Sequence, residues 1–60
     1  MQAMTKVIIE YQDQLSVWRR YTEMHHEPSA FRTAQNRTRQ KGVRHRLVDA
    51  DGHLLDLIEP

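Results

Sequence analysis

The chain lacks cysteine and has only two glycines, two prolines and four aromatic residues (one Trp, two Tyr and one Phe) in 60 positions. Without cysteine, disulfide bonds and thiolate zinc sites are both excluded. A domain of this length buries only about 60% of the surface that its unfolded chain exposes, so its core provides a small stability margin. Because good packing and association with another subunit are the remaining sources of stability, we expect self-association.

The chain also lacks a long apolar run. No stretch approaches the roughly 18 residues that a bilayer-spanning helix needs. Residues 1–6 contain neither the basic segment nor the long apolar segment of a secretory signal. We therefore expect a cytoplasmic protein with no membrane association, formed by a single domain over residues 1–60 in which residues 1–4 are a disordered lead-in.

Residues that typically carry catalysis are missing or badly spaced. There is no thiol nucleophile, no spacing that favours a Ser-His-Asp arrangement, and no glycine-rich phosphate loop, since Gly42 and Gly52 are the only glycines. No pair of carboxylates is placed as a plausible acid and base. A module of this size also lacks the deep pocket that an active site usually needs. We expect no enzymatic activity and no cofactor.

Metal binding is not indicated either. The four histidines, at positions 25, 26, 45 and 53, do not follow a metal-ligand spacing. Asp49 and Asp51 precede Gly52 as in a calcium loop, but in that alignment the first and twelfth ligand positions fall on Leu47 and Ile58. Since neither side chain carries an oxygen, we expect turn and surface roles for these residues.

Charge is unevenly distributed although the formal net charge is only +1. Residues 28–48 contain no carboxylate, and residues 49–60 contain no lysine or arginine. The basic residues of the middle segment are Arg32, Arg37, Arg39, Lys41, Arg44 and Arg46. Such a segment is able to follow a phosphate backbone, so nucleic-acid binding is the alternative function. The near-zero net charge argues against a dedicated nucleic-acid binder.

The first half of the chain predicts two strands. Residues 5–11 alternate in the manner of a strand and place Val7, Ile9 and Tyr11 on one face. After a polar break, residues 15–26 fit either a strand or a helix. We prefer the strand, because tryptophan, tyrosine, valine and threonine favour it and because a polar break after a first strand commonly begins a hairpin.

Residues 29–41 predict a helix. Pro28 suits its first turn, and Gly42 suits its end. Phe31, Ala34 and Thr38 form a narrow apolar stripe at helical spacing, and the basic residues near the end favour the negative end of the helix dipole.

Residues 43–58 predict a β-hairpin. Asp49 begins a type I turn, and Gly52 follows in the left-handed conformation as a bulge, so that Asp49 opposes His53. In this register Leu47 opposes Leu55, and His45 is turned toward the core. A one-residue slip would exchange the two faces, so these partners are conditional on the turn.

These elements predict an α+β fold with a two-layer ββαββ arrangement, in which one helix packs on a four-stranded antiparallel sheet of order 2-1-3-4. The expected core consists of Val7, Ile9, Trp18, Phe31, Ala34, Leu47, Leu55 and Leu57.

One helix covers only one face of such a sheet, so the other face is the candidate site. Its expected apolar residues are Ile8, Val17, Tyr21, Val48, Leu54 and Ile58, and arginines lie among them. The residues on the solvent-facing side of a sheet are normally polar, whereas many of those on this face are apolar. We therefore expect a small non-enzymatic interaction or regulatory module, a homodimer through this face or a subunit that docks on a larger protein.

Overall fold

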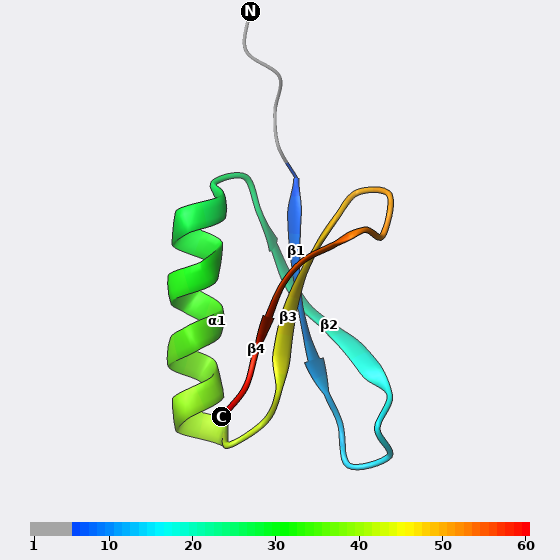
Figure 1. The fold of residues 1–60 in the computed structure, drawn as a ribbon, viewed down its shortest axis with the longest axis vertical. Helices are drawn as coiled ribbons and strands as arrows, with labels where there is room; N and C mark the ends of the chain where they lie inside the picture. The colour runs from blue at the N-terminus through cyan, green and yellow to red at the C-terminus, as the bar shows by residue number, and fades with distance from the viewer. Residues whose placement is uncertain (1–5) are drawn as a thin grey trace, which may run out of the picture.

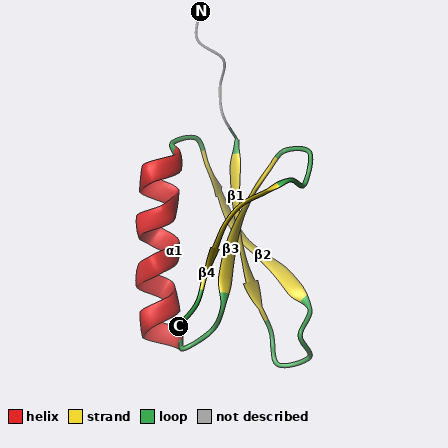
Figure 2. Cartoon of the chain, viewed as in Figure 1, coloured by secondary structure: helices red, strands yellow, loops and turns green. Residues whose placement is uncertain are grey.

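The computed structural model describes residues 6–60, and the expected lead-in at residues 1–4 lies outside this range. The elements are β1 (Val7–Gln12), β2 (Trp18–Met24), α1 (Glu27–Lys41), β3 (His45–Asp49) and β4 (Leu54–Ile58). All strand pairs are antiparallel in one sheet of order β2-β1-β3-β4, and α1 packs along one side of it (Figures 1 and 2). The predicted ββαββ fold and strand order are therefore confirmed, and residues 18–24 form a strand. The helix among the described residues is neither long nor apolar enough to cross a membrane.

The turn between β3 and β4 forms as predicted. Gly52 has a φ of 85°, and its N–H donates to the carbonyl of Asp49 at 3.0 Å. The Asp49 N–H donates to the carbonyl of His53 at 3.0 Å, and the Asp49 Oδ1 accepts from the N–H groups of Asp51 and His53 at 2.9 and 2.8 Å. Aspartate thus holds the turn from its first position, and glycine provides the left-handed residue.

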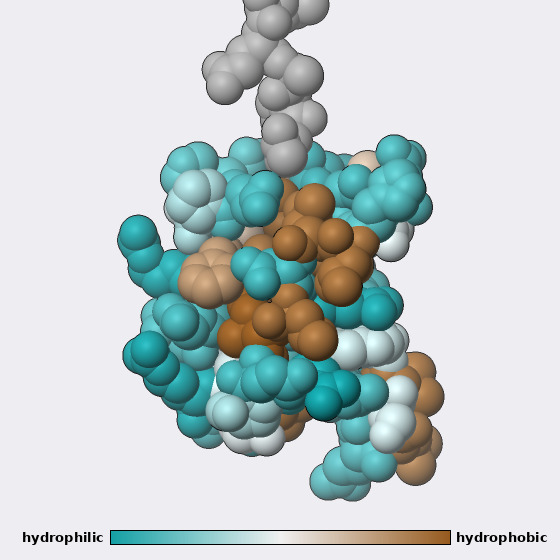
Figure 3. Space-filling view, viewed as in Figure 1, coloured by the Kyte–Doolittle hydropathy of each residue, from teal (hydrophilic) through white to brown (hydrophobic). Residues whose placement is uncertain are grey.

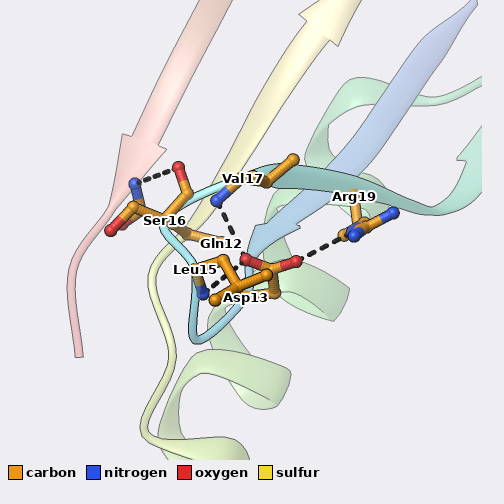
Figure 4. Close-up of polar contacts among 6 residues, drawn as sticks. All are labelled: Gln12, Asp13, Leu15, Ser16, Val17 and Arg19. Carbon is orange, nitrogen blue, oxygen red and sulfur yellow. Dashed lines mark hydrogen bonds and ion pairs between the residues drawn. The ribbon is translucent and has the colours of Figure 1, made fainter.

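The turn between β1 and β2 repeats this pattern without a glycine. Asp13 bonds to Ser16 and Val17 through its backbone, and its Oδ1 accepts from the N–H groups of Leu15 and Val17 at 2.8 and 2.9 Å (Figure 4). Ser16 takes the left-handed position with a φ of 65°. The Asp13 Oδ2 accepts from Arg19 Nε at 2.8 Å, and this bond, with the N–H of Val17, lowers the pKa of Asp13. The missing glycine is the reason that the sequence did not predict a tight turn here.

The helix begins at Glu27, two residues before the expected start, and places Pro28 in its first turn. Its end is as predicted: Gly42 has a φ of 66°, and its N–H donates to the carbonyl of Thr38 at 2.9 Å. Ala30, Ala34 and Thr38 are its buried residues. Small side chains on this stripe let the helix lie close to the sheet.

The core lies between α1 and the central strands β1 and β3. Its buried apolar residues are Val7, Ile9, Ala30, Ala34, Leu47 and Ile58, with Met24 and Phe31 partly buried against them. Three residues expected in the core are elsewhere: Leu55 and Leu57 are exposed, and Trp18 is only partly buried. Ile58, expected on the other face, is 7% exposed and belongs to the core.

A bulge in β4 explains the errors at Leu57 and Ile58. Val48 pairs with Leu54 and Leu47 pairs with Asp56, so Leu55 is an extra residue between them. An extra residue exchanges the faces of the positions that follow it. Ile58 therefore pairs with His45 on the helix side, and Leu57 turns away from the core.

A second bulge in β2 explains the error at Trp18. Ile9 pairs with Thr22 and Glu10 pairs with Arg20, which leaves Tyr21 as the extra residue. Trp18 consequently pairs with Gln12, on the face away from the helix. Both bulges lie in the edge strands of the sheet, where bulges are most common.

Candidate interaction surface

The side of the sheet that α1 does not cover is called the open face. Because Val7 and Ile9 point into the core, the alternate β1 residues point to the open face, and strand register extends this assignment to the other strands. The open face carries Ile8, Glu10, Gln12, Trp18, Arg20, Glu23, Arg46, Val48, Leu54 and Leu57.

The apolar part of this surface is centred on the edge strand β4. Leu54, Leu55 and Leu57 are 59%, 37% and 44% exposed, whereas Val48, paired with both Ile8 and Leu54, is buried. The β4 patch is the name used below for Ile8, Val48, Leu54, Leu55 and Leu57. Figure 3 shows apolar side chains gathered in the middle of the view, over the course of β4 in Figure 1. A cluster of exposed leucines on an edge strand is typical of an interaction site.

On the rest of the open face, charged side chains contact one another and Trp18. Arg46 lies between Glu10 and Trp18. The Arg46 Nε is 2.7 Å from Glu10 Oε1, and the Arg46 guanidinium carbon is 4.3 Å from the centroid of the Trp18 ring. The Arg46 and Glu10 side chains are 31% and 20% exposed. Their contact occupies charged groups that would otherwise need water, so this part is less available to a partner than the β4 patch.

The residues predicted to form the interface are only partly brought together. Ile8, Val48 and Leu54 lie side by side in register. Val17 is in the loop before β2, and Ile58 is in the core. The Tyr21 ring lies under the guanidinium of Arg37 from α1, at 3.6 Å.

Leu55 and Leu57 were not predicted as surface residues. Their signal was available in the composition of β4, whose sequence Leu-Leu-Asp-Leu-Ile is apolar on both of its faces. A strand with this pattern at the edge of a sheet exposes leucines whichever register it takes.

The six basic residues proposed for nucleic-acid binding do not form one surface. Arg46 is on the open face with Glu10, and Arg44 forms an ion pair with Glu59 at 2.9 Å. The remaining four, Arg32, Arg37, Arg39 and Lys41, are on α1. A phosphate backbone that follows the helix would therefore not reach Arg46 on the opposite side of the sheet.

Asp49, Asp51 and His53 gather in the β3–β4 turn, with one potential ligand atom from each within 4.8 Å of the others. The turn accounts for this grouping, because Asp49 accepts the N–H groups of both other residues. These bonds, that of His53 above all, lower the pKa of the Asp49 carboxyl.

His45 is turned toward the core on the helix side of the sheet, as the sequence predicted, and it is fully buried. Its Nδ1 lies 2.8 Å from the carbonyl oxygen of Val43 and 3.0 Å from Thr38 Oγ1. Burial lowers the pKa of His45, and the charge of Arg37 acts in the same direction, while the bond to Val43 opposes them. The folded protein therefore favours the neutral imidazole.

We expect the free energy of unfolding to fall as the pH drops below about 6.5, the ordinary pKa of histidine. The unfolded chain then binds a proton at His45 that the folded chain excludes, so protonation favours unfolding. Urea unfolding at about pH 7.5 and about pH 5.5 measures this loss. His45→Asn, which stays neutral over this range, should show a smaller loss; an equal loss in both proteins would assign the effect to another group.

Comparisons with known proteins do not identify a relative: no family model matches the chain, and no curated protein or solved structure matches it.

Proposed function

We propose that the chain is a small non-enzymatic interaction module that self-associates through the β4 patch. The observation that carries this proposal is the exposure of Leu54, Leu55 and Leu57 on one edge strand. Soluble monomers normally protect edge strands with charges, proline or a covering element. Here the apolar side chains continue onto Ile8 and Val48 of the open face.

A second copy of the chain is the partner that this surface fits. In a two-fold contact each copy supplies the same patch, so the exposed leucines of both copies are buried in the complex. Fully burying a leucine contributes about 1.5–3 kcal/mol, which is large compared with the small stability of a domain of this length. A dimer would thus supply the stability that the lack of disulfides leaves to packing.

The contact is expected between side chains of the open face rather than between strand backbones. At the edge of β4, the N–H of Leu57 donates to the carboxylate of Asp56 at 3.0 Å. This bond occupies a donor that an added strand would need, and a charged residue in an edge strand opposes strand addition. Stacking of two open faces leaves the Asp56 bond intact.

Light scattering after size-exclusion chromatography tests the proposal. We expect the wild type to have the mass of two chains, and Leu54→Lys and Leu57→Lys to have the mass of one while keeping the circular dichroism of the folded protein. Leu15→Lys is the matched control, because Leu15 is 78% exposed in the β1–β2 turn, outside the β4 patch. The proposal is wrong if the wild type is monomeric, or if the control dissociates as fully as the patch variants.

A further inference from the structure

The basic residues of the folded chain divide into a paired and an unpaired group. All nine lysines and arginines lie within residues 6–60, and five of them form ion pairs with carboxylates. The paired residues are Lys6, Arg19, Arg20, Arg44 and Arg46. Among the residues that the structure describes, those without a carboxylate partner are Arg32, Arg37, Arg39 and Lys41, all on α1. The chain has a near-zero net charge, but the positive charge of its helix is not neutralised.

The side of α1 that points away from the sheet carries long polar side chains. Because Ala30, Ala34 and Thr38 are buried against the sheet, the residues half a turn away from them point outward. The outward residues are Arg32, Asn36, Arg39 and Gln40, all exposed, with the partly exposed Gln35 beside them. Arginine, asparagine and glutamine are thus the only residue types along this side.

This composition differs from that of a helix side that only faces water. Such a side usually carries charges of both signs, and opposite charges three or four residues apart stabilise the helix. In α1 the one carboxylate is that of Glu27, the first residue, and neither Arg32 nor Arg39 has a carboxylate three or four residues away. The outward side lacks this source of stability, which favours a role for its cations in contact with an anionic partner.

Duplex DNA is the anionic partner that these side chains fit. Arginine pairs with guanine, and asparagine and glutamine pair with adenine, through the base edges of the major groove. That groove is about 12 Å wide and admits an α-helix, whereas the major groove of duplex RNA is too deep and narrow for side chains to read. The 15 residues of α1 extend over about 22 Å on the outside of the two-layer fold (Figure 1).

We propose that the outward side of α1 binds in the major groove of duplex DNA, where Asn36 faces the base edges. Arg32 and Arg39, together with the exposed Lys41 at the helix end, supply the positive charge that the phosphates require. The β4 patch lies at the open face, which α1 does not cover. DNA binding and self-association therefore use different surfaces, and each is tested independently of the other.

Fluorescence anisotropy with a labelled DNA duplex of about 20 base pairs, roughly two helical turns, tests this proposal at several sodium chloride concentrations. We expect the logarithm of the association constant to fall with the logarithm of the salt concentration at a slope of about −3, since each of three cations contributes about −0.9. Arg32→Gln and Arg39→Gln should each make this slope less steep by about 1 and weaken binding several-fold at low salt. Arg20→Gln is the matched control, because it removes the same charge from an exposed arginine of β2 that is paired with Glu23.

Competitors and a second duplex test the groove. Methyl green, which occupies the major groove, should displace the protein, whereas netropsin, which occupies the minor groove, should not. An RNA duplex of the same sequence should bind more weakly than DNA. Circular dichroism checks that the variants stay folded, as expected because glutamine favours a helix about as well as arginine. No binding at low salt, an equal loss in Arg20→Gln, failure of methyl green to displace the protein, displacement by netropsin, or RNA binding as tight as DNA would overturn the proposal.

Discussion

Replacing Ile58 by lysine is expected to unfold the chain, whereas replacing its neighbour Leu57 by lysine is expected to leave it folded. Ile58 is 7% exposed and packs in the core, so lysine there would place an unpaired charge in an apolar site. Such burial costs several kcal/mol, which exceeds the margin of many domains of this size. Leu57 is 44% exposed and faces away from the helix.

Circular dichroism and urea unfolding of the two variants measure this contrast. The pair is well matched, because the same residue is introduced at adjacent positions of one edge strand. If Ile58→Lys folded and Leu57→Lys did not, β4 would have the opposite facing, and the bulge at Leu55 would be contradicted.

The second large effect is expected at Leu47. This side chain is fully buried in the central strand β3, and truncation to alanine should lower the free energy of unfolding by about 2–5 kcal/mol. The same truncation at Leu55, which is 37% exposed, should cost less than at Leu47, because more of its apolar area stays in water in the folded chain.

Denaturant unfolding of Leu47→Ala and Leu55→Ala, at concentrations where both are in the same oligomeric state, gives this comparison directly. The two leucines were expected to face one another in the core on the basis of sequence alone. Similar losses at the two positions would support that pairing and contradict the one in which Leu47 opposes Asp56.

The order of elements was predictable because local signals agree with it. Alternating β-branched residues predict β1, Pro28 and Gly42 bracket the helix, and Asp49 with Gly52 defines the last turn. The sheet order then follows from hairpin adjacency and the handedness of the crossover.

The facing of the edge strands was not predictable, because both strands contain a bulge. An extra residue at Tyr21 or Leu55 leaves the local pattern unchanged but reverses every side chain on one side of it. In β4 both faces are apolar, so neither register is penalised by the sequence. The fold was therefore correct, while three of the six residues expected on the uncovered face, Val17, Tyr21 and Ile58, lie elsewhere.

The closeness of His45 and Arg37 was unpredictable for a different reason. His45 and Arg37 were noted separately, as a core histidine and as part of a basic segment. Their meeting depends on how α1 crosses the sheet and on the pairing of Tyr11 with His45. Such contacts between elements carry no signature in residue spacing.

The shared aspartate turns have a consequence for how the molecule assembles. Each hairpin has a short turn in which an aspartate side chain bonds to the turn backbone, so both hairpins are able to form early and independently. The seam between β1 and β3 joins residues from opposite halves of the chain. We expect the pairing of β1 with β3, together with the packing of α1 on them, to set the overall folding rate.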